Sequence, residues 1–387
     1  MQPVDPQTSR LTRVYLHLDR LSHNMKLLQR QVGDRALWPC IKANAYGHGA
    51  LIVARHLIRL GYETLGVADV GEAVELIDSG VEATFIVLSA MLPEHSEALI
   101  AYNCEPVVCT SEMVDALSKG AMKMGKRVVI HIKVDTGMGR IGIRPDQVSQ
   151  FLKYCGNCPG VFVRGLMSHF ACAEEADKTF SYQQIEVFKQ TIKAVREDGI
   201  EVRHMANSAG ILDLPNSYFD AARPGIAIYG LHPSREIVNP LVNELKPVLE
   251  WKSRVTFLKE VPAGTGLSYG QIYKTRHPSL IATVPVGYGD GLSRNLSGKV
   301  DFLVCGTRCS QVGRITMDMS LMDVTSLRGK VKLGDEVVII GIQGREQISA
   351  DELAEKLGTI NYEIVTCISR RVPRIIEGDP VATPGVK

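Results

Sequence analysis

The sequence Cys40-Ile41-Lys42-Ala43-Asn44-Ala45-Tyr46-Gly47-His48-Gly49 joins an apolar run to an amphipathic segment. The apolar run, 36–41, ends at Lys42, and the segment 51–60 that follows the small residues has the spacing of a helix. We predict a buried strand that places the amine of Lys42 at its carboxyl end, then a loop and a helix. A single lysine at such a position is most often a solvated residue. Its role therefore depends on which residues the rest of the chain places near it.

Length and composition describe an ordinary globular protein of two domains. At 387 residues the chain exceeds the size at which single cores stop growing. Its 45% hydrophobic and 22% charged residues are typical of soluble proteins. The net charge is only +2 and basic residues are scattered among acidic ones. We therefore expect neither nucleic acid nor an anionic membrane as a partner.

Several features indicate a cytoplasmic protein. The first ten residues are polar and contain no apolar segment of the kind found in secretory signals. The longest apolar run, 85–92, is too short to span a membrane. Nine cysteines cannot all pair, and their spread is typical of reduced thiols. The Cys155 and Cys158 pair has no second pair of ligands nearby, so we expect no metal site.

Strand and helix patterns alternate from residue 36 to residue 222. Eight strands alternating with helices are typical of a (β/α)₈ barrel, of the TIM type. A doubly wound open sheet is the alternative, and the count of eight favours closure. The predicted strands are 36–41, 65–68, 84–88, 105–109, 127–134, 161–167, 202–205 and 218–222. The predicted helices are 51–60, 71–77, 93–102, 111–124, 146–154, 177–197 and 208–214.

Unusual polar residues follow five of these predicted strands. Chemistry in such barrels gathers at the carboxyl ends of the strands, so these side chains should share one rim. Each alone could be a capping or solvated residue, but five on one rim favour a functional site. The residues are Lys42, the run from Lys133 to Arg140, Ser168-His169, Asn207-Ser208 and Arg223-Pro224-Gly225.

The last two loops of the predicted barrel could bind a phosphate group. Ser208 offers a hydroxyl at a helix start, and Gly225 and Ile226 offer backbone N–H groups after strand eight. Phosphate sites in barrels are frequently built from these two loops. An N-cap serine and a turn glycine would leave the same pattern, and both interpretations stay open on this signal alone.

From residue 245 onward, period-two runs separated by glycines predict a mostly β second domain. We predict a barrel domain over 13–244 and a β-rich domain over 245–387 together with 1–12, although the strand-like run 14–18 could also join the β-rich domain. Tyr269 lies between glycines and could project from a tight loop; glycine-flanked aromatics also mark hairpins. The predicted strands are 251–259, 280–286, 300–304, 319–324, 336–340, 362–368 and 372–376, with one helix at 350–357.

Several blocks of the sequence resemble the alanine racemase family, the fold-type III enzymes that use pyridoxal 5′-phosphate. They occur at family-like spacing and span nearly the whole chain. The resemblance implies a pyridoxal-phosphate-binding barrel, a β-rich domain and alanine racemisation by a homodimer with shared active sites. The blocks are Lys42-Ala-Asn-Ala-Tyr46-Gly-His-Gly, Lys133-Val-Asp-Thr-Gly-Met-Gly-Arg140, Ser168-His169-Phe170, Asn207-Ser208, Arg223-Pro-Gly-Ile-Ala-Ile-Tyr229-Gly, Leu267-Ser-Tyr269-Gly, Val286-Gly-Tyr288-Gly-Asp-Gly and Asn361-Tyr362-Glu363.

The resemblance also implies the catalytic residues. Lys42 would hold the cofactor as a Schiff base and act as one acid/base group. Tyr269, reaching in from the partner subunit, would be the other. Arg223 would face the pyridine nitrogen, and His169 would link that arginine to Tyr269. The remaining implied cofactor-binding residues are Tyr46, Asn207, Ser208, Gly225, Ile226 and Tyr362.

On the substrate side, the resemblance places Arg140 near the cofactor hydroxyl and the substrate carboxylate. Lys133 matches a lysine that is often carbamylated in the family, and the added negative charge would orient Arg140. Met317 and Asp318 of the partner subunit would lie near the substrate, and Tyr288 near the entrance.

These residue types suit racemisation, which removes a proton from one face of the α-carbon and returns one to the other. Two fixed groups on opposite faces solve this directly, with the cofactor as electron sink. A lysine amine can act as a base once substrate displaces it. A tyrosine hydroxyl ordinarily has a pKa of about 10 and is a poor base. It needs positive charge nearby to favour the phenolate form. An arginine keeps its proton, so the ring nitrogen would stay unprotonated and transamination would be suppressed.

The sequence departs from the family pattern at a few positions. Thr316 stands where the family often has cysteine, and Gly289 where alanine is commoner. Leu292-Ser293 replaces a tyrosine-proline pair. These positions would lie near the substrate entrance and the partner interface, so they bear on fine specificity and dimer tightness.

Three alternative functions remain. A serine-preferring or broader racemase would share the architecture, but Tyr362, Asn44 and the lack of a signal peptide favour alanine. A fold-type III decarboxylase would carry a cysteine-plus-acid motif and a glycine-triplet phosphate loop, neither of which is present. A pyridoxal-phosphate homeostasis protein would be a single barrel without the Tyr269 domain. The sequence leaves open whether the D-alanine would serve peptidoglycan synthesis or arise in catabolism.

Overall fold

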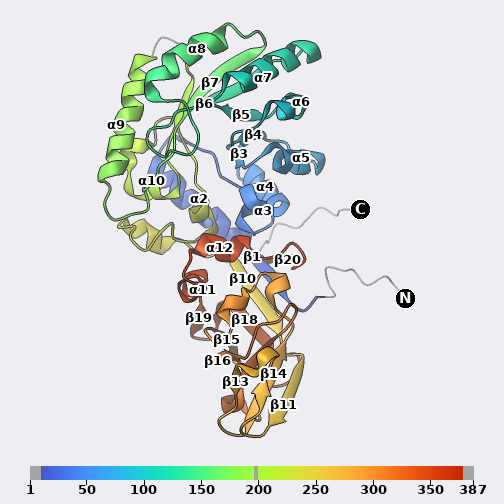
Figure 1. The fold of residues 1–387 in the computed structure, drawn as a ribbon. Coiled ribbons are helices and arrows are strands. Elements are labelled where there is room, and N and C mark those ends of the chain that lie inside the picture. Colours follow the sequence, from blue (N-terminus) through green and yellow to red (C-terminus); the bar gives the residue numbers. More distant parts are fainter. Residues whose placement is uncertain (1–9, 196–198, 378–387) are drawn as a thin grey trace. The chain divides into compact units, whose positions relative to one another are not determined.

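The computed structural model describes residues 10–195 and 199–377 and contains two compact units (Figure 1). The barrel unit comprises Arg20–Ala45 and Ala50–Lys246, and the β unit comprises Met1–Asp19, Tyr46–Gly49 and Pro247–Lys387. The two domains predicted from the sequence, 13–244 and 245–387 with 1–12, stay a prediction. The absence of a leader was inferred mainly from residues outside the described part, and the end of the predicted helix 177–197 also lies outside it.

The barrel unit is built on eight parallel strands that form a nearly closed barrel, which confirms the predicted fold class. The order around the sheet is β2-β9-β8-β7-β6-β5-β4-β3. A parallel bridge between Cys40 and Gly66 connects the chain after β2 to β3. The strands are β2 (Ala36–Leu37), β3 (Thr64–Val67), β4 (Thr84–Val87), β5 (Glu105–Val108), β6 (Val128–Lys133), β7 (Val161–Met167), β8 (Val202–His204) and β9 (Ala221–Ala222).

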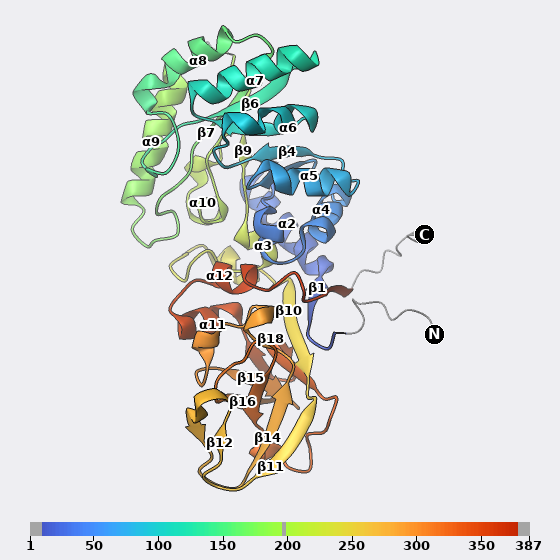
Figure 2. The ribbon, with the colours of Figure 1, turned by 45° about the vertical axis from the view of Figure 1, so that its right-hand side comes forward.

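Helices lie along the outer side of this sheet (Figure 2). Their ends follow side-chain signals: Thr110 accepts a hydrogen bond from Met113 N at the start of α7, and Gly125 ends that helix in the left-handed region. This helix has the predicted bounds. The helices are α2 (Leu18–Val32), α4 (Ala50–Arg59), α5 (Val70–Asp78), α6 (Ser96–Ala101), α7 (Ser111–Met124), α8 (Val148–Gly156), α9 (Thr179–Ala194) and α10 (Ser208–Asp213).

The first barrel strand is shorter than predicted. Regular pairing with β9 ends at Leu37, because Pro224, the next residue on the β9 side of the ladder, has no N–H to donate. The chain nevertheless stays attached to the strand beside it: Trp38 N donates to Ala222 O at 2.9 Å and Cys40 N to Pro224 O at 2.8 Å. The carboxyl end of this segment, and Lys42 after it, are therefore held against the end of β9.

The β unit contains a ten-stranded sheet with the order β11-β14-β17-β16-β15-β18-β10-β1-β20, and β19 pairs with β18. Strand β1 pairs antiparallel with β10 and parallel with β20, so the amino-terminal strand belongs to this sheet. Strands β12 and β13 form a separate hairpin. The strands are β1 (Arg13–His17), β10 (Leu249–Arg254), β11 (Phe257–Val261), β12 (Gly266–Leu267), β13 (Tyr273–Lys274), β14 (Ser279–Val284), β15 (Asp301–Val304), β16 (Thr307–Val312), β17 (Ser320–Asp323), β18 (Glu336–Gln343), β19 (Glu346–Ile348) and β20 (Arg374–Glu377).

Two predictions for the β unit were wrong. The run 362–368 is not a strand: helix α12 (Asn361–Thr366) follows α11 (Ala350–Leu357), and its buried residues include the adjacent Ile364 and Val365. Short apolar runs of β-branched residues do not distinguish the two structures. The run 251–259 is divided into β10 and β11, because its pairing partner changes from β18 to β14.

The segment after Ile41 forms a left-handed turn, α3 (Lys42–Tyr46). Ala43, Asn44, Ala45 and Tyr46 all have φ between 51° and 54°, which costs L-residues roughly 1–2 kcal/mol each. Within the barrel unit, the Glu72 carboxylate accepts from Ala43 N at 2.6 Å and from Ala68 N at 2.7 Å. Asn44 Oδ1 accepts from Ala50 N at 2.8 Å. Strain of this kind is concentrated at functional sites.

Replacement of Gly47 by alanine should destabilise the protein by about 3 kcal/mol or more. Gly47 has φ +80°, and a Cβ there would overlap the carbonyl oxygen of Val365 and lie 2.8 Å from its carbon. Gly80 is the matched control, because it also has φ +80° but a Cβ added there would have no atom within 4 Å. Gly80→Ala should cost only about 1–2 kcal/mol. Urea unfolding followed by tryptophan fluorescence measures both; equal losses would contradict the packing argument.

Candidate active site

The barrel unit places the predicted rim residues at the carboxyl ends of its strands. Lys42 follows β2 and is half-buried, while Lys133 is the last residue of β6 and is buried. His169, Ser208 and Arg223 follow β7, β8 and β9. Five strands therefore deliver polar or cationic side chains to one edge, as parallel strands of a barrel must when these residues come just after them.

Arg223 is the most connected of these residues. Its Nη2 donates to Ser168 O at 2.8 Å and to Met205 O at 3.0 Å, and lies 3.4 Å from His169 Nδ1. Its Nη1 donates to His204 Nδ1 at 2.7 Å. Burial lowers the pKa of Arg223 to about 10, so it remains a cation at neutral pH. The predicted proximity of Arg223 and His169 is present in the structure.

Sequence reasoning missed the residues behind Arg223. His204 Nε2 lies 3.0 Å from His131 Nδ1, and His131 Nε2 lies 3.0 Å from Glu105 Oε2. Arg164 Nη1 donates to both carboxylate oxygens of Glu105, at 2.9 and 3.0 Å. One signal in the sequence could have indicated them: each of two apolar strands contains a histidine. A polar side chain that faces the interior of a barrel needs a hydrogen-bond partner.

Lys133 has an unusual environment for a lysine. It is buried, and among residues 10–195 and 199–377 its Nζ has no hydrogen-bond partner. Burial, together with the charges of Arg223 and Arg140, lowers the pKa of Lys133 well below its ordinary value. Burial and the charge of Lys133 likewise lower the pKa of His169 well below its usual range. The lowered pKa favours the neutral amine of Lys133, which is the nucleophilic form.

The loops after β8 and β9 form a polar cradle inside the barrel unit. Ser208 Oγ accepts from Gly225 N at 2.8 Å and from Ala227 N at 3.2 Å. Asn207 Oδ1 accepts from Gly210 N at 2.9 Å and so caps α10. Hydroxyl and N–H donors at a helix start are the groups that hold phosphate in such loops. Ser208, Gly225 and the adjacent Ile226 are thus brought together and fit a phosphate group.

The two tyrosines predicted to bind the same phosphate lie in the β unit. The rings of Tyr46 and Tyr362 have centroids 6.1 Å apart and planes inclined by 53°. Arg374 donates to Gly47 O through Nε at 3.1 Å and Nη2 at 2.8 Å, which anchors the segment that carries Tyr46. The resemblance implies one phosphate-binding set made of these two tyrosines with Ser208, Gly225 and Ile226, and within the β unit the two tyrosine rings lie side by side.

Tyr269 projects from a strained loop of the β unit. Its side chain is 72% exposed. Ser268 and Gln271 have positive φ of 61° and 44° although neither is glycine, and Ser268 Oγ donates to Arg314 O at 2.7 Å. The loop is therefore fixed in shape while its tyrosine is held outward.

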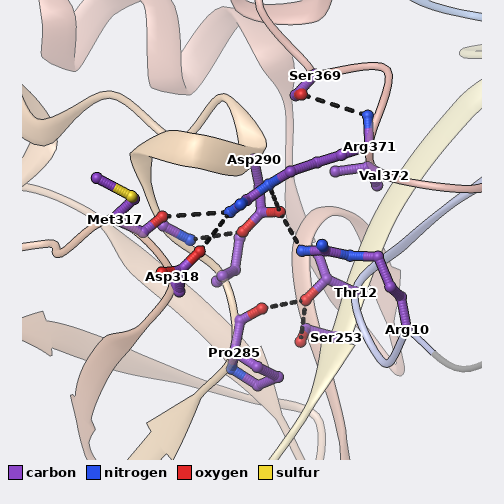
Figure 3. Close-up of polar contacts among 12 residues, drawn as sticks. Arg10, Thr12, Ser253, Pro285, Asp290, Met317, Asp318, Ser369, Arg371 and Val372 are labelled. Atoms are coloured by element: carbon purple, nitrogen blue, oxygen red, sulfur yellow. Dashed lines mark hydrogen bonds and ion pairs between the residues drawn. The ribbon is translucent and has the colours of Figure 1, made fainter.

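An ion cluster around the buried Asp290 holds the predicted substrate-facing loop of the β unit (Figure 3). The fully buried Asp290 carboxylate accepts from Arg10 Nη2 at 2.6 Å and from Arg371 Nε at 2.9 Å. Arg371 Nη2 also donates to Asp318 Oδ1 at 2.8 Å. Buried carboxylates normally need this kind of pairing. Arg10 and Arg371 are partners that the sequence analysis did not identify.

The cluster explains the glycine at position 289. A Cβ on Gly289 would lie 2.5 Å from Arg371 Nη2 and 3.0 Å from Met317 O. The absence of a side chain there leaves space for the guanidinium to reach Asp318. Tyr288, which the sequence places at the entrance, is held beside this loop because its N–H donates to Thr316 O at 3.0 Å.

The fold and the rim of charged side chains define a barrel enzyme with a mostly β second unit. Residues 16–233 match the alanine racemase N-terminal domain and residues 248–376 the alanine racemase C-terminal domain. An alanine racemase of Halothermothrix orenii is 43% identical over 374 residues, which are 96% of this chain and 98% of that protein. One of Clostridium novyi is 42% identical over 363 residues, covering 93% and 94%.

Solved structures agree. Alanine racemase of Clostridium difficile 630 superposes with a TM-score of 0.91 at 33% identity, over 95% of this chain and 96% of that one. The Bacillus anthracis alanine racemase with bound L-Ala-P has a TM-score of 0.90 at 37% identity, over 96% of each chain. The chain belongs to the alanine racemase family, a family of isomerases. Within the described ranges, no helix combines the length and apolar character of a membrane span.

Proposed function

We propose that this protein interconverts L-alanine and D-alanine with pyridoxal 5′-phosphate held on Lys42. The observation that carries the proposal is the position of Lys42 after a strand of the same barrel whose strands β9, β7 and β6 place Arg223, His169 and Lys133 at their carboxyl ends. Bound pyridoxal phosphate supplies an electron sink for the charge left when the α-proton departs. The polar cradle formed by the loops of Ser208 and Gly225 fits the phosphate of pyridoxal phosphate.

Arg223 would face the pyridine nitrogen of the cofactor. Its pKa of about 10 means that it presents a proton at neutral pH and does not give it up. The ring nitrogen would then accept a hydrogen bond without becoming protonated. Such a nitrogen withdraws less charge from the substrate, and this favours return of the proton over transamination.

Two groups would move the proton, one on each face of the substrate. The amine of Lys42 would act on one face, and Tyr269 of the partner subunit on the other. Arg140 would bind the substrate carboxylate, and the partner's Met317 and Asp318 would border the substrate, with Tyr288 at the entrance. The exposure of Tyr269 supports this division, because its loop is shaped within the β unit while the hydroxyl stays accessible.

A homodimer is supported by the exposed side chains around Tyr269. Large apolar groups of the β unit are exposed near this loop and the loop of Met317, and exposed apolar patches of this kind mark interaction surfaces. The loop of Met317 lies against the Tyr269 loop, since Ser268 Oγ donates to Arg314 O, and against the Tyr288 loop, since Gly289 N donates to Met317 O at 2.9 Å. The exposed residues are Tyr269, Ile272, Tyr288, Met317 and Met319.

Lys133 should carry a carbamate. Its neutral amine can add to carbon dioxide, forming an N–C bond and releasing one proton, and the resulting anion would pair with Arg140 and Arg223. With ¹³C-bicarbonate, NMR should show a protein carbamate resonance that Lys133→Met removes. Lys178→Met is the control, because Lys178 already has a carboxylate partner, Asp213, at 3.1 Å.

Lys133→Met should also lower kcat about tenfold, the size of one charge-assisted hydrogen bond. A resonance that persists in Lys133→Met, or is absent from the unsubstituted protein, would contradict the assignment.

The reaction itself is tested with L-alanine, and separately L-serine, in D₂O. We expect α-deuteration and loss of optical activity with L-alanine at a higher kcat/KM than with L-serine. A preference for L-serine would indicate the broader racemase, and release of carbon dioxide a decarboxylase. We further propose a cytoplasmic enzyme whose D-alanine serves peptidoglycan synthesis or belongs to alanine catabolism.

A further inference from the structure

A path of polar side chains crosses the interior of the barrel unit. It begins at Glu105, the first residue of β5, and ends at Arg223, which follows β9. His131 of β6 and His204 of β8 lie between them, and both are completely buried. Barrels of this kind are normally filled by layers of branched apolar side chains. A polar path in that position is stable only if its donors and acceptors are matched.

The donor-only character of Arg223 determines where every proton in the path lies. A guanidinium has no acceptor, so His204 Nδ1, 2.7 Å from Nη1, must be unprotonated. His204 then carries its proton on Nε2 and donates it to His131 Nδ1 at 3.0 Å. His131 in turn carries its proton on Nε2 and donates it to Glu105 Oε2 at 3.0 Å. Only this direction satisfies all three contacts.

The environment supports two neutral histidines and an ionised carboxylate. Burial lowers the pKa of His131, and burial with the charge of Arg223 lowers that of His204 well below its usual range. Burial alone would raise the pKa of Glu105, but the hydrogen bond from His131 and the charge of Arg164 outweigh it and lower the pKa.

Two further residues keep the imidazoles in place. Trp38 packs edge-on against His204, with ring centroids 4.9 Å apart, and against His131 at 5.9 Å. Gly165 provides the necessary space: a Cβ there would overlap His131 Nδ1 and lie 2.7 Å from a methyl of Val202. The histidines are therefore confined to the orientation that the path requires.

We infer that Glu105 is a positioning residue for Arg223 and acts through His131 and His204. The acceptor at position 105 holds the proton of His131 on Nε2, which keeps His204 Nδ1 free to accept from Arg223. Without that acceptor, the His131 proton can move to Nδ1, where it opposes the Nε2 proton of His204. This inference rests on the proposed function for what Arg223 faces, the cofactor ring.

The proton positions can be measured directly by NMR on the full chain with ¹⁵N-labelled histidine, with and without pyridoxal phosphate. At about pH 7, above the ordinary pKa of histidine, His131 and His204 should both be neutral with the proton on Nε2. A proton on Nδ1 of either ring would overturn the inference. This measurement needs no substituted protein and no turnover.

Glu105→Ala removes the terminal acceptor. We expect mixed tautomers at His131 and His204, and a kcat for alanine about tenfold lower with KM unchanged. Glu105→Gln keeps an acceptor oxygen and should restore the tautomers and most of the rate. Glu201→Ala is the control: Glu201 also approaches Arg164, at 3.8 Å, but its side chain is 57% exposed. Glu201→Ala should change neither the tautomers of His131 and His204 nor kcat.

If Glu105→Ala matches Glu201→Ala in both spectra and rate, the inference is wrong whatever the substrate. If the unsubstituted protein does not racemise alanine, the proposed function fails, and the tautomers still decide whether the path runs from Glu105 to Arg223. The two failures are therefore distinguishable.

Discussion

Lys42→Ala should reduce racemisation of alanine by at least about 10⁴-fold. The variant would lose both the covalent anchor of the cofactor and the proton-transfer group for one face, and general acid–base catalysis alone is worth about 10²–10⁴-fold. The left-handed turn that begins here holds Lys42 in place through Glu72 and Asn44. No neighbouring lysine should substitute, because Lys133 is buried at the end of a different strand.

The measurement pairs kinetics with the absorbance of the bound cofactor. Lys42→Ala should lack the visible band of lysine-bound pyridoxal phosphate, and borohydride should no longer attach the cofactor to the protein. Lys123→Ala is the control, since Lys123 is 71% exposed and pairs with surface Glu97 at 2.9 Å. Retention of the band and of covalent attachment in Lys42→Ala would refute the anchor assignment.

Tyr269→Phe should lower kcat about 10³-fold, within the range of a lost acid–base group. The loss should be unequal: exchange of the α-proton catalysed by Lys42 on its own face should persist in D₂O, while inversion to the other enantiomer fails. Tyr273→Phe makes the same change four residues away, on β13, and should leave the rate within about twofold. Equal loss of exchange from both enantiomers would count against a one-face role.

Subunit exchange tests whether Tyr269 acts across a dimer interface. Lys42→Ala and Tyr269→Ala are each expected to be inactive. In a mixed dimer, one site would carry both substitutions and the other neither. Random exchange of equal amounts makes half of the dimers mixed, so about a quarter of the unsubstituted activity should return. Absence of recovery, with exchange verified by mass, would contradict the shared site.

The barrel was predictable because its signals are local. Each strand is a short apolar run, each helix has its own period and caps, and α7 begins and ends where its sequence predicts. The rim followed from topology, since residues just after parallel strands must share one edge. Local signals failed where they were ambiguous, as in the β-branched run that forms α12, and where strand partners change, as between β10 and β11.

For the site, the sequence indicated Lys42, Lys133, His169, Ser208 and Arg223 as residues of one edge, and the resemblance supplied their proposed roles. The sequence could not indicate which buried side chains contact these residues from the interior of the barrel. Along the path from Glu105 through His131 and His204 to Arg223, the three successive contacts join residues 26, 73 and 19 positions apart. Such pairs leave no periodicity in the sequence.

The sequence by itself therefore determined the family, the eight-stranded barrel and the lysine at the end of its first strand, because these depend on residue order and local pattern. Only the tertiary structure decided that this lysine begins a left-handed turn and that a path of polar side chains reaches Arg223 from the opposite end of the strands. It also showed that Arg10 and Arg371 meet at Asp290. Each of these depends on burial and on contacts between distant segments, where an unmatched charge or hydrogen bond would be costly.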